Sequence, residues 1–472
     1  TINIDNSIFH GTRSNMTMFT GYDKVVIEGS MFVNNISYNN NADFNSSDIS
    51  ISNSIITANH NIGTAPVIRH SIVQGGYSGT NIRDVDPMLR NINDPAGPDG
   101  IFGTPDDGLR PIVGSPAINT GYIANSAALN LAQNSTDITG APRYQDGALD
   151  VGPYEGSACP EVIYVDANVT SSGNGRSWQT ALKTLHEALA VADNCNTFTT
   201  IKVAKGTYLS THGQGSKDQS LIIKRANLKI EGGYDPSTNK RHIKTNPSIL
   251  SGNFSSINGS FDKSYHVMMI VGVTAQTDSL IVDGFEITAG DANGDGNRTI
   301  NNTVVHDGHG GGIFIKDCSN GENLVLRNLT FRNNRAKRFG GALHIINSSP
   351  LIDRCVFSNN RTEGINSTGG GALATETSGS PKVVNSVFVN NATQNVGGAI
   401  YNSNTTPRII NVTFFKNSSV NGANAIYNGS STNLSIINTL IWGDSGESLI
   451  INNTSSVTTS YSNIRQTSGI YP

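Results

Sequence analysis

A stretch rich in aspartate, "DVDPMLRNINDPAGPDGIFGTPDDG", occupies residues 84 to 108. Carboxylates gathered on a glycine-rich loop with few cations can surround a hard cation such as Ca²⁺, which takes roughly six to eight oxygen ligands. The candidate calcium ligands are Asp94, Asp99, Asp106 and Asp107. A solvated turn whose aspartates cap backbone N–H groups explains the same residues, so calcium binding and a plain turn both remain open.

A second acidic stretch, "GDANGDGN", begins at residue 290. Asp291, Asn293 and Asp295 precede Gly296 in the order of an EF-hand calcium loop. The twelfth position of that loop would be Asn302, which cannot supply the bidentate carboxylate of an EF-hand. We therefore interpret this stretch as a loop inserted between repeats.

A group of cations surrounds the turn "FRNNRAKRFGG". Arg332, Lys337 and Arg338 lie in this turn, and Arg354 follows one repeat later. Together they could bind an acidic glycan, and a lyase would need such a base beside a calcium-bound uronate. The alternative is a solvated turn with no ligand.

Two histidines, His306 and His309, stand in the glycine-rich segment "HDGHGGG". The segment superficially resembles the Gly-His-Gly of polygalacturonases, which hydrolyse acidic sugars. Glycoside hydrolysis needs two carboxyl groups across the scissile bond. The downstream acids Asp353, Glu363 and Glu376 do not form the paired pattern of that family. We interpret both histidines as loop residues beside a glycine turn rather than as catalytic groups.

The chain has four cysteines. Cys159 and Cys195 bracket a helical segment, a placement that suits a disulfide in an oxidising compartment, although two thiols fit it equally. Cys355 occupies the repeat position of Leu329 and is expected in the core, and Cys318 is expected in a loop.

These residues must be positioned by a repeat. The segments "RFGGALHIINSSPLIDRCVFSNN", "GGGALATETSGSPKVVNSVFVNN" and "VGGAIYNSNTTPRIINVTFFKN" share glycine turns, short β-branched strands and a closing asparagine. Their phenylalanines Phe331, Phe357, Phe388 and Phe414 are 26, 31 and 26 residues apart. Such a period predicts an all-β solenoid with one coil per repeat.

The solenoid predicts ladders of equivalent side chains. Phe, Val, Ile and Leu should stack inward, and the asparagines that close each repeat should hydrogen-bond along the stack. These asparagines are Asn333, Asn334, Asn359, Asn360, Asn390, Asn391 and Asn417.

The repeat pattern divides the chain into two modules. Residues 1–156 read as the last coils of one module followed by an acidic closing tail, and residues 157–472 read as a second module. Helical spacing of apolar residues predicts a helix over about 177–193, capped by Ser177, that covers the exposed end of the second stack. The glycine-glycine-alanine coils run from 310 to 472. Both ends of the chain fall inside a pattern, so we expect a piece of a longer protein.

Composition excludes two classes of partner. Only 14% of the residues are charged, the net charge is -4, and no cluster of Lys and Arg alternates with aromatic residues. Nucleic-acid binding is therefore not expected. No apolar run reaches the roughly 18 residues of a membrane-spanning helix.

The repeats resemble a known class of right-handed parallel β-helix proteins of the bacterial surface. "GGAL...FSNN" and its equivalents resemble the repeats of polymorphic outer-membrane proteins, and "VIYVDANVTSSGNGRSWQTALKTLHEAL" resembles the opening module of large secreted β-helix proteins of Bacteroidota. "DGLRPIVGSPAINTG" is similar to their closing module. The resemblance implies a right-handed parallel β-helix, export often through the type IX system, and an extracellular cell-surface location.

The function expected from this resemblance is structural. The main hypothesis is a non-enzymatic shaft of a large secreted adhesin or filament, whose partners are other modules of the same chain, further copies of it, or a surface polysaccharide. The alternatives are a polysaccharide lyase or glycoside hydrolase acting on acidic glycans, and a glycan-binding module without turnover. Calcium is the one cofactor that the residues suggest.

Overall fold

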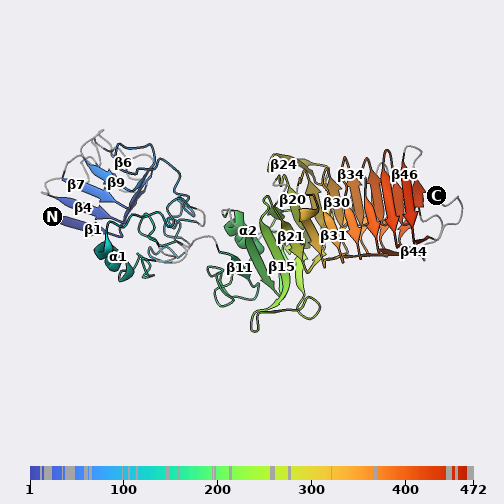
Figure 1. The fold of residues 1–472 in the computed structure, drawn as a ribbon, viewed down its shortest axis with the longest axis horizontal. Helices are drawn as coiled ribbons and strands as arrows, with labels where there is room; N and C mark the ends of the chain where they lie inside the picture. Colours follow the sequence, from blue (N-terminus) through green and yellow to red (C-terminus); the bar gives the residue numbers. More distant parts are fainter. Residues whose placement is uncertain are drawn as a thin grey trace. The chain divides into compact units, whose positions relative to one another are not determined.

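The computed structural model folds into two compact units (Figure 1). The first unit comprises Thr1–Pro160 with Asn194–Asn196, and the second comprises Glu161–Asp193 with Thr197–Pro472. The structure describes residues 1–10, 13–14, 24–33, 36–37, 48–57, 62, 66–97, 99–104, 107–112, 115–144, 148–156, 160–193, 195, 198–211, 215–255, 261–274, 278–319, 321–365, 369–442, 449–451 and 455–464.

The first unit contains two short parallel sheets followed by an irregular tail. One sheet has the order β1 (Ile2–Asp5), β4 (Val25–Glu28), β7 (Ile49–Ser52), β9 (Val67–Arg69), and the other has the order β10 (Ile72–Val73), β8 (Ile55–Ile56), β5 (Met31–Val33), β2 (Ile8–His10). A two-residue pair joins β3 (Arg13–Ser14) to β6 (Ile36–Ser37). The tail carries a short helix, α1 (Ser126–Gln133), that the sequence pattern did not predict.

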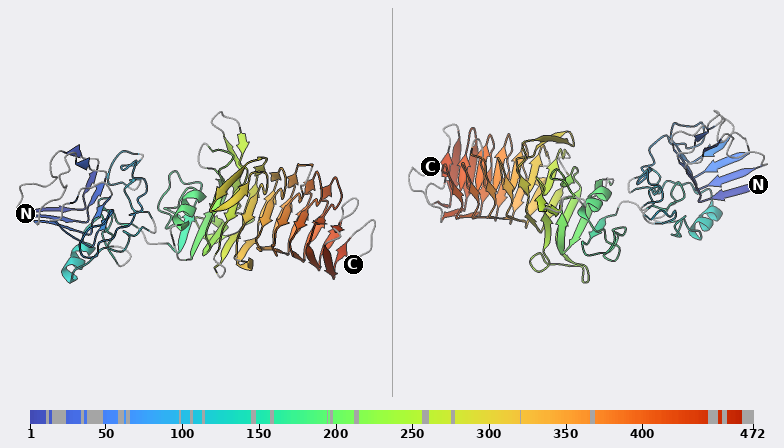
Figure 2. Two further views of the ribbon diagram at one scale, coloured as in Figure 1. Left: turned by 90° about the horizontal axis from the view of Figure 1, so that it is seen from above. Right: turned by 180° about the vertical axis from the view of Figure 1, so that it is seen from behind.

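The second unit is a stack of coils whose strands form three long parallel sheets (Figure 2). Sheet A has the order β11 (Val162–Val165), β12 (Thr199–Ala204), β15 (Leu228–Asp235), β21 (Leu280–Asp283), β27 (Leu324–Arg327), β31 (Leu351–Asp353), β35 (Lys382–Val384), β39 (Arg408–Ile410), β43 (Asn433–Ile437), β46 (Ser456–Ser460), with β16 (Lys240–Arg241) paired to β15. Sheet B has the order β13 (Gly206–Leu209), β17 (Ser248–Ser251), β22 (Phe285–Thr288), β28 (Thr330–Arg332), β32 (Val356–Ser358), β36 (Val387–Val389), β40 (Thr413–Phe415), β44 (Leu440–Trp442), β47 (Asn463–Ile464).

Sheet C has the order β14 (Leu221–Ile223), β20 (Met268–Val271), β26 (Ile313–Lys316), β30 (Leu343–Ile346), β34 (Leu373–Glu376), β38 (Ile400–Ser403), β42 (Ile426–Asn428), β45 (Leu449–Ile451). Sheet D is a narrow strip with the order β23 (Asp291–Ala292), β29 (Arg335–Ala336), β33 (Arg361–Thr362), β37 (Ala392–Thr393), β41 (Ser418–Ser419). A single 3₁₀ turn, η1 (Gly321–Asn323), precedes β27. The expected all-β, parallel β-helix solenoid is confirmed.

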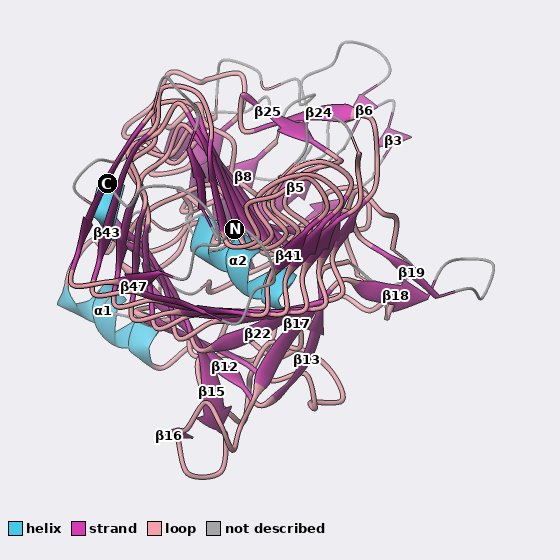
Figure 3. Ribbon diagram, turned by 90° about the vertical axis from the view of Figure 1, so that its right-hand side faces the viewer, coloured by secondary structure: helices cyan, strands magenta, loops and turns pink. Residues whose placement is uncertain are grey.

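Each coil visits the sheets in the same order, as Figure 3 shows end on. The coil that begins with β27 continues through β28 on sheet B, β29 on sheet D and β30 on sheet C before β31 returns to sheet A. Neighbouring strands pair in parallel register, so that residues one repeat apart lie directly opposite each other. The repeat in the sequence therefore becomes a stack of equivalent side chains.

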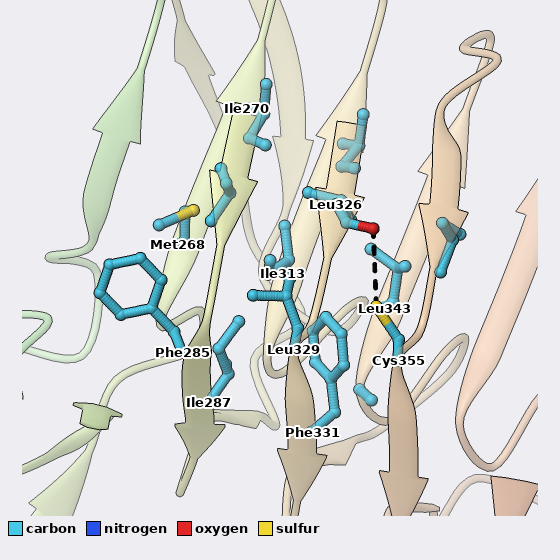
Figure 4. Close-up of a cluster of buried hydrophobic side chains, with 14 of the residues drawn as sticks. Met268, Ile270, Phe285, Ile287, Ile313, Leu326, Leu329, Phe331, Leu343 and Cys355 are labelled. Carbon is cyan, nitrogen blue, oxygen red and sulfur yellow. Dashed lines mark hydrogen bonds between the residues drawn. The ribbon is translucent and has the colours of Figure 1, made fainter. Parts of the chain in front are cut away.

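The predicted phenylalanine ladder lies in the core of the second unit. Phe331, Phe357, Phe388 and Phe414 are fully buried, and their successive ring centroids are 4.7, 4.4 and 5.0 Å apart with nearly parallel planes. Figure 4 shows how residues from sheets A, B and C meet in this core. Offset stacking of aromatic rings adds to the hydrophobic burial.

The predicted asparagine ladder is also present, and it explains why asparagines come in pairs. The second member of each pair is buried, and its side-chain amide donates to the Oδ1 of the next: Asn334 to Asn360 (3.1 Å), Asn360 to Asn391 (3.0 Å) and Asn391 to Asn417 (2.9 Å). The first member, such as Asn333 or Asn359, has a positive φ, a backbone conformation that asparagine tolerates. Each pair thus turns the chain and joins adjacent coils.

The glycine pair before each buried alanine has a steric role. In the turn at Gly340 and Gly341, the first glycine has a φ of 58°. A Cβ at the second would lie 2.3 Å from the carbonyl oxygen of Gly371 in the next coil. The next repeat places Gly371 in the same relation to Gly398. Only glycine permits this close approach of successive coils.

The capping helix is shorter than expected. α2 runs over Leu185–Asp193 rather than from about 177, and the predicted cap Ser177 lies outside it. The helix begins at a capping box in which the Thr184 hydroxyl accepts from the Glu187 N–H (3.2 Å) and the Glu187 carboxylate accepts from the Thr184 N–H (2.8 Å). Upstream of this box, Leu182 forms an isolated parallel bridge with Val165, which holds that segment in an extended conformation.

The covering role of the helix is confirmed. Leu185, Ala188, Leu189 and Ala192 are buried in the same apolar cluster as the strands of the first coils. Figure 3 shows α2 behind the coils at the end of the stack. The helix therefore shields the apolar end of the stack.

Two hairpins extend from the regular coils. One pairs β18 (Asn253–Ser255) with β19 (Phe261–Lys263), and the other pairs β24 (Asn297–Ile300) with β25 (Thr303–His306). The second hairpin belongs to the loop that the sequence predicted between coils. It packs beside the outer face of sheet C, where Val305 joins a small cluster with Met269 and Phe314. Neither helix in the described part of the chain is long and apolar enough to cross a membrane.

The cysteine predictions have different outcomes. Cys355 is buried in the core, as expected, and Cys318 lies after β26 in a segment that is not a strand but is equally buried. Cys195 is also buried. Cys159 lies outside the described residues, so the Cys159–Cys195 disulfide stays a prediction.

Replacing one ring of the phenylalanine ladder by a charge should disrupt the coils around it. We expect Phe388→Asp to lower the free energy of unfolding by more than about 4 kcal/mol, because an ionised carboxylate would lie between two buried rings. The matched control is Phe415→Asp, since Phe415 is 39% exposed on the outer side of the same sheet. Denaturant titration of both variants gives the comparison, and equal stabilities would contradict the ladder.

Changing one amide of the asparagine ladder should make stability depend on pH. In Asn360→Asp, the carboxylate would replace an amide that donates to the carbonyl oxygen of Phe331 and to Oδ1 of Asn391 (both 3.0 Å). We expect a loss of about 2 to 4 kcal/mol at pH 7.

The sign follows from the acid's pKa, which burial beside two acceptors raises above its unfolded value of about 3.9. The loss of stability caused by Asn360→Asp is therefore smallest below about pH 3.9, where the acid is neutral in both states, and it grows as the pH rises and the buried acid must ionise. Denaturant titrations at pH 3.5 and pH 7 measure it, and Asn359→Asp on the exposed neighbouring position is the control. A loss that is independent of pH would argue against the ladder.

Candidate functional site

The four predicted glycan-binding cations each face a carboxylate. Arg332 pairs with Glu286 at 2.5 Å, Lys337 pairs with Asp295 at 2.5 Å, and Arg354 pairs with its neighbour Asp353 at 2.9 Å. Arg338 lies 3.9 Å from Asp295. These pairs are partly exposed, and such pairs add little stability, but they reduce the positive charge available to an acidic ligand.

The structure also separates these cations. Arg332 is on β28 of sheet B, whereas Lys337 and Arg338 follow β29 on the way to sheet C. Arg354 lies at the turn between sheets A and B, where it lines a shallow groove of about 430 Å³ together with Lys244 and Glu286. Glu286, the partner of Arg332, also lines this groove. Glycan binding by the four cations stays a prediction.

The acidic loop of the first unit uses its described aspartates in different ways. Asp107 is buried, and its carboxylate accepts hydrogen bonds from the N–H groups of Gly103 (2.7 Å) and Thr104 (3.2 Å) and from the Tyr154 hydroxyl (2.7 Å). Burial and the adjacent Asp107 carboxylate raise the pKa of Tyr154. Asp107 therefore organises the loop from inside.

The remaining calcium candidates lie elsewhere in the loop or outside the described residues. Asp99 accepts from the N–H of Ile101 at 2.8 Å, as expected of a turn-capping aspartate. Asp94 stands in a turn closed by hydrogen bonds to its backbone. Asp106 lies outside the described residues, and calcium binding by this loop stays a prediction.

The second acidic stretch pairs with cations instead of gathering around a common centre. The Asp291 carboxylate accepts two hydrogen bonds from Arg335, at 2.6 and 3.0 Å. Asp295 faces Lys337, and the hydrogen bond and charge of Lys337, together with the charge of Arg338, lower the pKa of Asp295. The hairpin β24–β25 follows directly, which agrees with an inserted loop rather than an EF-hand.

The structure brings together a group of histidines that the sequence did not connect. We call His309, His344 and Glu376 the His–His–Glu cluster. His309 comes from the glycine turn before β26, His344 from the middle of β30 and Glu376 from the end of β34. These three strands are consecutive on sheet C, so the cluster draws one residue from each of three successive coils.

The members of the cluster are hydrogen-bonded in a chain. His344 Nε2 lies 2.8 Å from Glu376 Oε2, and His344 Nδ1 lies 3.2 Å from His309 Nδ1. His344 is fully buried, His309 is 9% exposed and the side chain of Glu376 is 25% exposed. Each residue offers one atom that could bind a metal ion, and these three atoms lie within 4.8 Å of one another.

Aromatic rings and two further histidines surround the cluster. The rings of Phe339 and Phe314 lie 5.7 and 5.8 Å from that of His344, and the ring of His306 lies 4.9 Å from that of His309. His266 is buried nearby, with its Nδ1 3.0 Å from the carbonyl oxygen of Gly310. Four of the ten histidines in the chain therefore gather on this part of sheet C.

Burial controls the ionisation of these groups. Burial lowers the pKa of His309 and of His306, and the positive charges of their neighbours act in the same direction. Burial also lowers the pKa of His266, to about 3. Burial opposes the ionisation of Glu376, but the hydrogen bond and charge of His344 outweigh it and lower its pKa. Burial thus favours the neutral forms of His309, His306 and His266, whereas Glu376 is favoured in its ionised form.

The sequence contained two members of the cluster but not their relation. His309 was interpreted as a loop histidine, and Glu376 was considered only as one of three downstream acids. His344 was not selected, although "ALHII" is a strand in which a polar residue interrupts an apolar run. Aligning the repeats on their glycines would have placed His344 and Glu376 on successive strands of one sheet.

Comparisons with known proteins agree with the fold. Residues 283–441 match the family described as "Right handed beta helix region". The second unit is therefore a right-handed parallel β-helix, as the sequence predicted. No curated protein matches the chain.

Two solved structures show a distant likeness. "Pectin methylesterase PemA from Erwinia chrysanthemi" is 14% identical, with a TM-score of 0.30, and the match covers 62% of this chain and 80% of that one. "Crystal structure of pectin methylesterase in complex with hexasaccharide VII" is 14% identical, with a TM-score of 0.33, and the match covers 65% of this chain and 90% of that one. At these values, activity must be argued from the residues of this chain.

The pairing of the predicted cations with carboxylates can be tested by releasing them. We expect Asp295→Asn to leave Lys337 and Arg338 without their partner and to raise the salt concentration at which the protein elutes from immobilised polygalacturonate. Asp262→Asn is the control, because it releases Lys217 elsewhere on the surface with the same change in net charge. Equal shifts in the two variants would mean that only net charge matters.

Proposed function

We propose that this chain is a structural shaft segment of a larger, secreted bacterial cell-surface or filament protein. The observation that supports it is the regular repetition of the same contacts from coil to coil. From β28 to β44, sheet B places Phe331, Phe357, Phe388, Phe414 and Ile441 in one register, and the buried asparagines follow the same period. Such a stack resists bending because each coil is bonded to both neighbours.

The dimensions of the second unit suit a spacer. Sheet A contains ten strands along its main path, and strands in a sheet are about 4.8 Å apart, so this stack extends over about 43 Å. Further modules of the same kind would lengthen it in proportion. In this proposal the partners are other modules of the same chain, further copies of it, or a surface polysaccharide.

The acids suggested by the sequence do not form a hydrolase pair. Asp353 lies on sheet A, Glu363 follows β33 of sheet D, and Glu376 lies on sheet C. Glu363 pairs with Arg335 (2.8 Å) and with a second arginine, Arg361 (2.9 Å). Because hydrolysis of a glycoside needs two carboxyl groups on either side of one bond, this distribution favours the shaft over the hydrolase.

The size and location of the native polypeptide test the proposal. Whole cells are treated with protease, lysed and blotted under denaturing conditions with an antibody against residues 338–360. We expect a band several times larger than the 50.0 kDa of this chain, lost on treatment of intact cells. A periplasmic protein blotted in parallel controls for cell integrity, because it must survive the protease.

The opposite result would replace the proposal. A soluble species near 50 kDa that resists surface proteolysis would be incompatible with a shaft in a long surface protein. Release of unsaturated or reducing products from polygalacturonate by that species would instead establish the polysaccharide lyase or hydrolase.

A further inference from the structure

We propose that the His–His–Glu cluster on sheet C is a binding site for a divalent transition-metal ion such as Zn²⁺. The proposal is independent of the shaft function, and neither depends on the success of the other. It rests on the donor atoms of His309, His344 and Glu376 and on how the coils present them.

The donor set has the composition of a zinc site. Two imidazoles and one carboxylate bind Zn²⁺ in proteins and leave a fourth position for water or another ligand. Nitrogen donors favour a borderline ion such as Zn²⁺ over Ca²⁺ or Mg²⁺, which prefer oxygen. Within the described part of the chain, the cluster is also the one group of three His, Cys, Asp or Glu residues whose possible ligand atoms lie within 4.8 Å of one another.

The three side chains lie close enough together to reach one ion. His344 Nε2 and Glu376 Oε2 are 2.8 Å apart, and the Nδ1 atoms of His309 and His344 are 3.2 Å apart. Ligand atoms around Zn²⁺ lie about 3.4 Å from one another, given bonds of about 2.0 to 2.1 Å. One nitrogen of each imidazole and one oxygen of Glu376 already lie within 4.8 Å of one another. Small side-chain rotations would bring these three atoms to the spacing of a coordination shell, and His344 would exchange one of its two hydrogen bonds for the metal ion.

The surroundings hold the donors in place. His344 is enclosed on a central strand with the rings of Phe314 and Phe339 beside it, and the ring of Phe339 also contacts that of Tyr401 at 5.2 Å. An apolar shell of this kind restricts water and strengthens the interaction of a metal ion with its ligands. The partly exposed Glu376 provides the side from which the ion enters.

Binding would join three successive coils. His309, His344 and Glu376 belong to the coils of β26, β30 and β34, whose strands pair with one another on sheet C. An ion that binds only the folded protein stabilises it by an amount that grows with the logarithm of the ion concentration above the dissociation constant. A stability measurement is therefore a readout that requires no enzymatic activity.

The experiment titrates the metal-free protein with Zn²⁺ by calorimetry and records the melting temperature at each concentration. We expect one ion per chain and a melting temperature that rises with Zn²⁺, whereas Ca²⁺ at equal concentration should have no such effect. Co²⁺ in place of Zn²⁺ should give visible absorption bands of nitrogen and oxygen ligation.

Variants assign the site to these residues. We expect His309→Gln and Glu376→Gln each to weaken Zn²⁺ binding by at least about 100-fold, since loss of a direct ligand exceeds the roughly 10- to 100-fold effect of outer partners. The matched controls are His242→Gln, on an exposed turn where His242 contacts Thr245, and Glu286→Gln on sheet B. Circular dichroism shows whether each variant is folded.

The outcomes decide the proposal. One-to-one binding that is lost in both cluster variants and kept in both controls supports it. Absence of Zn²⁺ binding by the folded wild-type protein, or equal affinity in cluster and control variants, overturns it. Both cluster variants retain a polar side chain of similar size, so we expect both to fold. If one of them does not, the other still tests the site.

Discussion

Parallel hydrogen bonding between successive coils is the constraint on which the second unit depends. Every strand of sheets A, B and C pairs with its equivalent in the next coil, so a residue must tolerate its own counterpart as a neighbour. Apolar side chains satisfy this condition by stacking, and buried amides satisfy it because each amide both donates and accepts. The phenylalanine and asparagine ladders are the direct result.

The same constraint governs charge. Buried carboxylates that face each other in successive coils must be compensated by cations: Asp283 lies opposite the buried Glu231, and Arg241 contacts both. Asp283, whose side chain is 1% exposed, accepts from Arg241 and Arg327 on either side, and these bonds lower its pKa despite burial. The cations suggested as glycan ligands follow the same rule on the surface. The low fraction of charged residues in the chain is consistent with a fold that leaves few places for them.

The His–His–Glu cluster forms where the repeat is interrupted. Sheet C bears an apolar outer patch beside the inserted hairpin β24–β25, and His344 takes the place that Phe314 and Ala374 occupy in the adjacent coils. Three different residues from three coils can then converge because none of them has to repeat. A solenoid can therefore carry a specific site without losing its ladders.

The sequence by itself determined the coil, its period and its ladders, because in a solenoid the residues in contact are those that occupy equal positions in the repeat. It also predicted the core position of Cys355 and the presence of a capping helix, whose first turn was nevertheless set by the local box of Thr184 and Glu187. Only the tertiary structure decided which polar residues outside the repeating ladders meet. His309 and Glu376 are 67 positions apart and lie at different places in their repeats. Their convergence on His344 depends on side-chain direction across a sheet, which the period of the sequence does not encode.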